Sequence, residues 1–342
     1  MKGFKASPRS IVFWLVVVTM VFAFSGVTAL RAATTLKLGF VTAADPKDPY
    51  YIASKKWAEL IEKYTHGKYK VALYPSGQLG NESDMIRNIM VGTQDLGVIT
   101  NAPTGSFVSS FMVLDMPFIF PSYQVAHKVL DGPTGKALLS KLDKINIKGL
   151  AFAEGGFRHM INNVRPIRTP ADLKGIKFRV MKAPVYLAMF KALGANAVPM
   201  PWGEVFTAVQ QHVVDGLEIP IPVIWANKFY EVTKYLSLTG HTYSPLIMMV
   251  SGNLWKRLSK EDQAAFQKAA IEAARYERQT IEAIIQDLIN KLKAKGMVVN
   301  QVPDKRPFME MVKPVYKQFE GKIGKETLEM VLKARDEAMA TK

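Results

Sequence analysis

The uninterrupted helical segment from Lys260 to Lys295 is the feature that most constrains the fold. Ser259 and Asp262 fit a capping box at its start, and Gly296 suits its end. Thirty-six residues at a rise of about 1.5 Å each would reach roughly 54 Å. That length exceeds the width of one small α/β domain, and the apolar positions keep no strict heptad for a coiled coil. The segment therefore predicts one helix that runs across two domains.

The front of the chain alternates between strand and helix patterns. The β-rich runs 36–41, 70–75 and 95–100 predict three strands. Between them, Trp57, Leu60, Ile61 and Tyr64 fall at helical spacing, and a second helix is expected to begin near Asn81. This order favours a parallel sheet covered by helices.

The same alternation continues through the middle of the chain, and 342 residues are enough for two domains. A threonine, a proline and an acid at positions 169, 170 and 172 form a further helix start signal. The remaining expected elements are strands at 149–155, 175–181 and 244–252 and helices at 183–193 and 203–211. The sequence therefore indicates an α/β protein.

The first thirty or so residues have the layout of a secretory leader. Lys2, Lys5 and Arg9 give a basic start, Ile11–Phe24 is almost wholly apolar, and small residues follow. An apolar core of about 14 residues is shorter than the ~20 that span a bilayer. We predict that residues 1–33 are a signal peptide cleaved within 29–33, an uncleaved anchor being the alternative. A lipobox is excluded because the chain has no cysteine.

The net charge is +16, and four of the cations but no acid precede residue 33, which leaves +12 for the exported part. A basic balance can serve nucleic acid, an acidic membrane or an anionic solute. We do not expect nucleic acid as a partner, because an exported chain rarely meets it and the lysines form no dense arm. Most of them are expected to lie on a solvated surface.

Motifs of local chemistry are absent from the sequence. None of the five histidines forms an HxH or HxxxH pair, so no metal site is predicted. The sequence contains no GxSxG, P-loop or GxGxxG motif, so no cofactor is predicted either. Catalytic groups can come from distant segments, but these absences favour binding over catalysis.

Five stretches carry a resemblance to a known family. They are YPSGQLGNE (74–82), LDMPFIF (114–120), GFRHMINNVRPIRTPADLKGIKFRV (156–180), LGANAVPMPWGEVFTAVQQHVVDGLEIP (193–220) and KFYEVTKYLSLTGHTYSPL (228–246). In this order they resemble the solute-binding proteins of tripartite ATP-independent periplasmic (TRAP) transporters, of the dicarboxylate and sialic-acid type. The resemblance runs through most of the chain after the leader.

The resemblance implies a periplasmic two-domain α/β fold with crossing hinge strands and one long helix spanning both domains. Domain I would comprise residues 34–155 and 245–283, and domain II residues 156–244 and 284–342. The ligand, a small carboxylate, would bind in the cleft, and membrane permease subunits would receive it. The alternatives are a binding protein for another transporter or a receptor, and a carboxylate-handling enzyme on the same scaffold.

The resemblance assigns two arginines to the ligand. Arg179 ends the family motif G-x-K-x-R, here Gly175 to Arg179, and a guanidinium matches a carboxylate with paired N–H donors. Its alternative is a pair with a surface acid. Arg158, in GFRHM, matches a second family arginine, for which a salt bridge that braces the domains is the alternative.

Other candidate ligand contacts are weaker. Glu82 follows GQLG and would accept bonds from ligand hydroxyls, or else cap the helix near Asn81. Asn101 and Phe40 stand at strand ends where the cleft should open, although phenylalanine often belongs to the core. Trp202 lies where the family often has an aromatic residue, and Tyr243 is a similar candidate.

The chain departs from its relatives after the VDG motif. Many of them read E-N-P there, with an asparagine that touches the ligand, whereas this chain reads Glu218-Ile219-Pro220. Isoleucine offers no hydrogen bond, so a ligand beside Ile219 should be apolar or less hydroxylated at that end. A sialic-acid-like or heavily hydroxylated acid is disfavoured, and the role of Glu218 stays open.

Overall fold

The computed structural model describes residues 33–340, so the predicted signal peptide lies almost wholly outside the described part of the chain. From Thr34 onward the chain forms one compact unit. Its strands are β1 (Thr34–Gly39), β2 (Tyr69–Tyr74), β3 (Leu96–Thr100), β4 (Ile147–Asn162), β5 (Lys177–Val180), β6 (Asn196–Pro199), β7 (Gly216–Pro220), β8 (Tyr235–Ser251) and β9 (Val298–Gln301).

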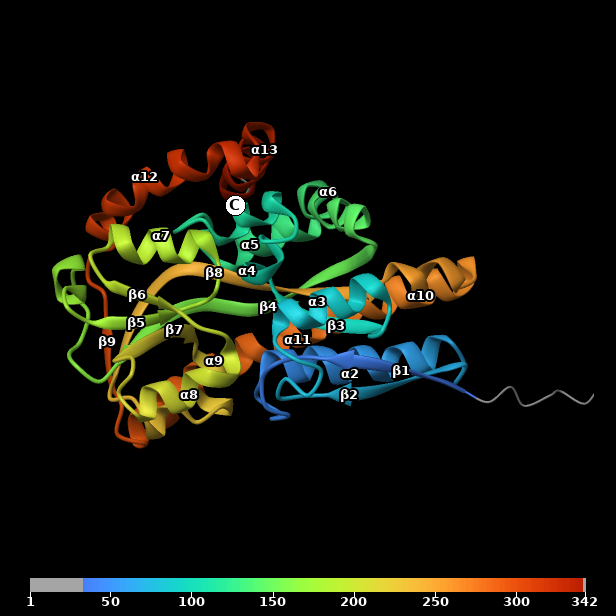
Figure 1. Cartoon of the computed structure of the whole chain (residues 1–342), viewed down its shortest axis with the longest axis horizontal. Coiled ribbons are helices and arrows are strands. Elements are labelled where there is room, and N and C mark those ends of the chain that lie inside the picture. Colours follow the sequence, from blue (N-terminus) through green and yellow to red (C-terminus); the bar gives the residue numbers. More distant parts are fainter. Residues whose placement is uncertain (1–32, 341–342) are drawn as a thin grey trace, which may run out of the picture. The chain divides into compact units, whose positions relative to one another are not determined.

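Helices cover this sheet (Figure 1). The α-helices are α2 (Pro49–Tyr64), α3 (Glu82–Val91), α4 (Asn101–Thr104), α5 (Tyr123–Asp131), α6 (Pro133–Ser140), α7 (Pro184–Ala192), α8 (Trp202–Gln210), α9 (Ile221–Ala226), α10 (Gly252–Arg257), α11 (Lys260–Ala294), α12 (Arg306–Ile323) and α13 (Lys325–Ala340). Short 3₁₀ helices are η2 (Ser109–Asp115), η3 (Lys141–Ile145), η4 (Pro170–Leu173) and η5 (Phe229–Glu231).

Within residues 33–340 the strands form one mixed sheet in the order β2-β1-β3-β8-β4-β7-β5-β6, with β9 beside β8. Strand β1 pairs in parallel with β2 and β3, as the front of the sequence predicts. Strand β5 likewise pairs in parallel with β6 and β7. The two parallel groups are joined by antiparallel pairing through β8 and β4. The α/β class is confirmed, with a mixed rather than a wholly parallel sheet.

Strands β4 and β8 extend well past the runs expected from sequence, to 16 and 17 residues. The second half of β4 and the first half of β8 were missed because polar residues such as Arg158, His159 and His241 interrupt the apolar pattern there. The pairing shifts register between Glu154 and Gly156, where Gly156 has a positive φ of 99°. A glycine suits this irregularity because other residues rarely adopt that conformation.

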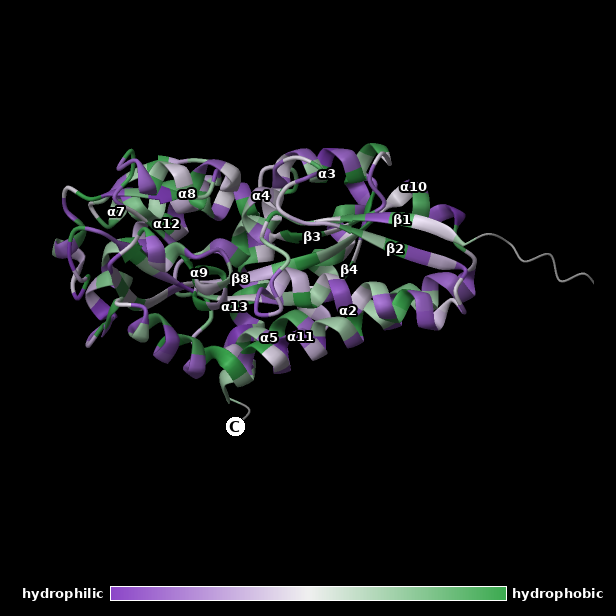
Figure 2. Ribbon diagram, turned by 90° about the horizontal axis from the view of Figure 1, so that it is seen from below, coloured by the Kyte–Doolittle hydropathy of each residue, from purple (hydrophilic) through white to green (hydrophobic). Residues whose placement is uncertain are grey.

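The predicted long helix is confirmed as α11, which is 35 residues long and has Ser259 as its N-cap. Alanines such as Ala269 and Ala273 on its buried face allow close packing, and α11 runs beside α2 and β4. Figure 2 shows hydrophilic and hydrophobic residues interleaved along α2 and α11. The Glu277 carboxylate accepts from Glu154 N at 2.8 Å, so the helix holds the middle of β4.

The helix start signal at Thr169 yields only the four-residue η4, so the expected helix is wrong in length. The Asp172 carboxylate accepts from Thr169 N at 2.7 Å, as a capping residue would. Two residues after η4, Gly175 adopts a positive φ of 82° and the chain turns into β5. The capping interaction is therefore present, but only a short 3₁₀ helix follows it and not an α-helix.

Candidate ligand-binding site

A narrow pocket lies where strands and helix starts from both parallel groups of the sheet converge. It is lined by Val41, Thr42, Tyr50, Glu82, Gly155, Arg158, Arg179, Met181, Trp202, Ile219, Pro220, Val223 and Ser244. The walls leave about 20 Å³ of free volume, room for about one water molecule. Five of the eight residues predicted from sequence meet here, and a ligand larger than water requires the walls to separate.

Arg179 lies on β5 and is only 3% exposed. Its Nε and Nη2 atoms donate to the carbonyl of Met200 at 3.0 and 2.7 Å, and its guanidinium lies 5.9 Å from the Trp202 ring centre. No carboxylate within residues 33–340 forms an ion pair with it. Burial, aided by the neighbouring Arg158, lowers the pKa of Arg179 to about 10. The pocket thus contains a buried cation that an anionic ligand would neutralise.

Arg158 lies on β4 and is fixed by Glu218 of β7. Its Nε and Nη2 atoms both donate to the Glu218 carboxylate, and Nη2 also donates to the Glu218 carbonyl at 2.6 Å. Burial disfavours the charge on Arg158, but the Glu218 carboxylate raises its pKa overall. Arg158 therefore forms a salt bridge, but its partner belongs to the same predicted domain II, so the bridge does not brace two domains, and the side chain also lines the pocket.

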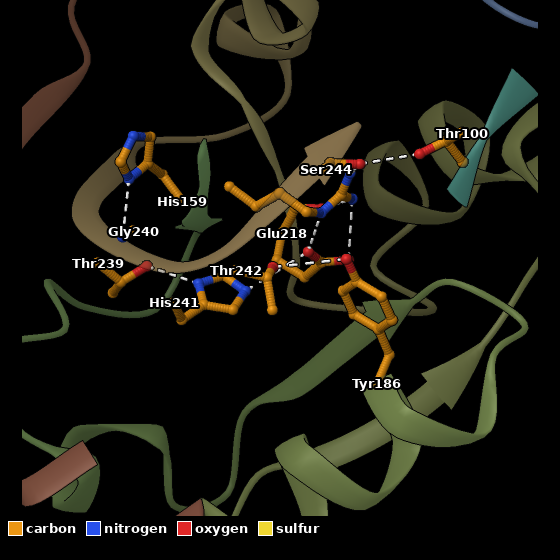
Figure 3. Close-up of polar contacts among 10 residues, drawn as sticks. Thr100, His159, Tyr186, Glu218, Thr239, Gly240, His241, Thr242 and Ser244 are labelled. Atoms are coloured by element: carbon orange, nitrogen blue, oxygen red, sulfur yellow. Dashed lines mark hydrogen bonds and ion pairs between the residues drawn. The ribbon is translucent and has the colours of Figure 1, made fainter. Parts of the chain in front are cut away.

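Glu218 belongs to a buried polar network, part of which Figure 3 shows. His241 Nε2 lies 3.5 Å from the Glu218 carboxylate, and His241 Nδ1 lies 2.7 Å from the Thr239 hydroxyl. Burial raises the pKa of Glu218, but Arg158 and His241 lower it overall. The open role of Glu218 is thus resolved structurally, since it compensates the charge of Arg158.

Glu82 is the first residue of α3, yet Asn81 caps that helix in a box with Asp84. The Glu82 carboxylate instead accepts from Thr100 N at 3.2 Å. Burial raises the pKa of Glu82 to about 7, although Thr100 N–H and the two pocket arginines oppose this. A carboxylic acid group that changes protonation near neutral pH therefore faces Arg179 across the pocket.

Trp202 and Ile219 give the pocket an apolar side. Trp202 begins α8 and packs on Phe229 with ring centres 5.4 Å apart. Ile219 of β7 is 1% exposed and lines the pocket together with Val223. The isoleucine that replaces the family's asparagine thus contributes an apolar wall.

Three predicted residues lie outside the pocket lining. Asn101 is buried and donates to the carbonyl of Phe111 and to Asp115 Oδ1, which ties α4 to η2. Phe40 is fully buried in the core, in keeping with its alternative interpretation.

Tyr243 is buried as well, and its hydroxyl donates to Glu154 at 3.4 Å. Its ring packs edge-on against Phe120 and Phe157. Contact of these three side chains with a ligand remains an untested prediction.

Several pocket residues were missed by sequence reasoning. Thr42 and Tyr50 come from the loop after β1 and the start of α2, and Ser244 comes from the middle of β8. A single threonine, tyrosine or serine carries no local signal for binding. Thr42 could have been found by proximity, since Phe40, two residues earlier, was singled out at the strand end.

No group of three or more His, Cys, Asp or Glu side chains in residues 33–340 could hold a metal ion. Within the same range, no helix combines the length and apolarity needed to cross a membrane.

An internal pocket in an α/β fold that contains a buried arginine without an ion-pair partner is suited to a protein that binds an anionic solute. The model of the family described as bacterial extracellular solute-binding protein, family 7, matches residues 40–322. The chain belongs to this family of TRAP transporter solute-binding proteins, whose members are binding proteins and not enzymes.

Individual relatives extend over almost the whole chain. A TRAP periplasmic solute-binding protein from Polaromonas, bound to D-erythronate, is 39% identical with a TM-score of 0.85, covering 87% of this chain and 98% of that one. The sugar-acid-binding protein DctPAm of Advenella mimigardefordensis, in complex with galactonate, is 36% identical with a TM-score of 0.86, covering 90% and 99%. The 2,3-diketo-L-gulonate-binding periplasmic protein YiaO of Escherichia coli is 37% identical, covering 88% and 90%.

Proposed function

We propose that this protein captures a small hydroxylated monocarboxylate in its pocket and delivers it to the membrane permease of a TRAP transporter. The observation that carries the proposal is Arg179, a buried arginine with no carboxylate partner within residues 33–340. Arg158 is already neutralised by Glu218, so one ligand carboxylate suffices for Arg179. A second carboxylate on the ligand would face Glu82 or the apolar wall, so a monocarboxylate fits the pocket better than a dicarboxylate.

The pocket lining supports a hydroxylated acid with one apolar end. Thr42, Tyr50 and Ser244 provide hydroxyl groups on the walls. Ile219 and Val223 offer no hydrogen bond to a hydroxyl, and an unpaired buried hydroxyl is costly. Relatives bound to erythronate and galactonate agree with a sugar-acid class. The apolar wall favours the shorter acid.

The experiment is calorimetry with D-erythronate, D-galactonate, succinate and erythritol, the neutral counterpart of erythronate. We expect erythronate to bind most tightly, galactonate and succinate to bind more weakly, and erythritol not to bind. Mass spectrometry should recover the bound acid unchanged. Binding of erythritol as tight as that of erythronate, or no binding of any acid in a wider carboxylate panel, would contradict the proposal.

We further propose two domains that close on the ligand, residues 34–155 with 245–283 and residues 156–244 with 284–342. The free volume of about 20 Å³ supports this, because entry requires the walls to separate. The register shift at Glu154 and Gly156 lies at the proposed boundary. Small-angle scattering should give a smaller radius of gyration with the bound acid, and an unchanged radius would count against closure.

Export to the periplasm belongs to the same proposal. The family is extracellular, and the basic, apolar and small segments before residue 33 are typical of a cleaved leader. The permease partner follows from the class of transporter. The Arg179 side chain is buried, so we expect Arg179→Ala to keep co-purification with the permease subunits while losing the ligand.

A further inference from the structure

A second cavity lies on the opposite side of the sheet segments that wall the pocket. It is lined by Phe118, Phe120, Pro121, Tyr123, Phe157, His159, Ile221, Leu238, Gly240, Ile285, Ile289, Gln301, Lys305 and Met309. We call it the aromatic cavity. It shares no lining residue with the pocket. Successive residues of a strand point to opposite faces, so Arg158 faces the pocket while Phe157 and His159 face the aromatic cavity.

The aromatic cavity has the size and lining of a ligand site. Its volume is about 460 Å³, within the ~300–1,000 Å³ typical of small-molecule sites. Tyr123 and Phe157 meet edge-on with ring centres 4.8 Å apart and form part of its wall. Met309 remains 43% exposed at the rim. An apolar space of this size, open to solvent, favours an apolar occupant.

A cation without a partner stands at this cavity. Lys305 forms no ion pair with any carboxylate of the described chain. A side chain at Gly240 would begin 3.1 Å from Lys305 Nζ and 3.9 Å from His159 Cε1, so the ammonium and the imidazole converge on that glycine. Lys305 is exposed to solvent at the rim of the cavity, and partial desolvation lowers its pKa.

His159 adds a second donor at the same place. Its Nδ1 accepts from Gly240 N at 3.1 Å (Figure 3). Burial, with His241, Lys305 and Arg158 nearby, lowers its pKa to about 3, so the ring is neutral. A neutral ring that accepts at Nδ1 carries its proton on Nε2. That N–H has no hydrogen-bond partner within residues 33–340.

We propose that the aromatic cavity is a second binding site, for a small aromatic or branched apolar monocarboxylate. The apolar body would fill the space between Phe157, Ile289 and Met309, and the carboxylate would meet Lys305 and His159 at the rim. The net charge of +12 on the predicted exported part adds a general attraction for anions. This site is independent of the solute proposed for the pocket.

The test is fluorescence titration of the exported protein, residues 34–342, with 1-anilinonaphthalene-8-sulfonate, an aromatic anion. N-phenyl-1-naphthylamine serves as its uncharged counterpart. We expect one saturable site for the anion, weakened about ten- to hundredfold by Lys305→Gln because a charge-assisted bond is lost. Binding of the uncharged dye should change less than about threefold in the same variant, since its contacts are apolar.

Two controls complete the design. Lys317→Gln changes the same charge at an exposed position of α12 and should leave both dyes unaffected. Met309→Trp should fill the cavity from its exposed rim and weaken both dyes. The proposal is overturned if no saturable site exists, if Lys305→Gln behaves like Lys317→Gln, or if Arg179→Ala weakens the dye as much as Lys305→Gln, which would place it in the pocket.

Discussion

Arg179→Ala removes the guanidinium that we expect to bind the ligand carboxylate. In the closed pocket this leaves a desolvated anion without a partner. Truncating one member of a buried charged pair costs about 2–5 kcal/mol. Each 1.4 kcal/mol is about tenfold in affinity, so binding should weaken roughly 30- to 4,000-fold. Arg179→Lys should also bind poorly, because it keeps the charge but loses the paired donors.

Removing the charge of Arg179 should stabilise the ligand-free protein, although it weakens ligand binding. Burial lowers the pKa of Arg179 from its ordinary value to about 10, so at pH 7 the buried charge costs about 3 kcal/mol of folding free energy. Since the folded pKa is the lower one, this cost is full below pH 10 and disappears above the ordinary pKa of arginine. Arg179→Met removes the charge at similar volume. After loss of the bonds to Met200, we expect it to raise the free energy of unfolding by about 1–3 kcal/mol.

Calorimetry and urea unfolding at pH 7 measure the two effects. Arg257→Ala, which removes an exposed arginine, is the control and should change neither. A merely long-range role for Arg179 predicts near-normal affinity for the lysine variant and a strong salt dependence. If folded Arg179→Ala binds the acid within threefold of the wild type, the reasoning is refuted and Arg158 is the next candidate.

Three further predictions concern other sites. Ile219→Asn should widen acceptance towards longer hydroxylated acids by calorimetry, and unchanged binding of every acid would show that Ile219 does not contact the ligand. Glu82→Gln should stabilise the ligand-free protein by about 3 kcal/mol at pH 8 but by less than about 1 kcal/mol at pH 5. The reason is that the raised pKa makes the wild-type carboxylate costly only as pH rises above 4.5. Equal stabilisation at pH 5 and pH 8, measured by urea unfolding, would contradict the assigned pKa. N-terminal sequencing of the periplasmic protein should begin within 30–34, and an intact Met1 on membranes would exclude cleavage.

Much of the fold could be predicted from the sequence because it depends on local patterns. The α11 helix needs only a cap at Ser259, thirty-five residues without a helix breaker, and Gly296 after it. The parallel strands β1, β2 and β3 follow from their alternation with helices. The resemblance added the position of Arg179, which a short motif identifies without knowledge of its neighbours.

The partners of each charged side chain depended on the tertiary structure. Arg158 and Glu218 are 60 residues apart in sequence, and antiparallel pairing of β4 with β7 brings them together. Tyr50, Thr42 and Ser244 join the pocket only because α2, the loop after β1 and the middle of β8 converge there. The sequence by itself determined the helices, the parallel strand groups and the motif arginine, since each rests on neighbouring residues. Which arginine pairs with a carboxylate and which does not was decided by contacts between distant segments, which no local pattern encodes.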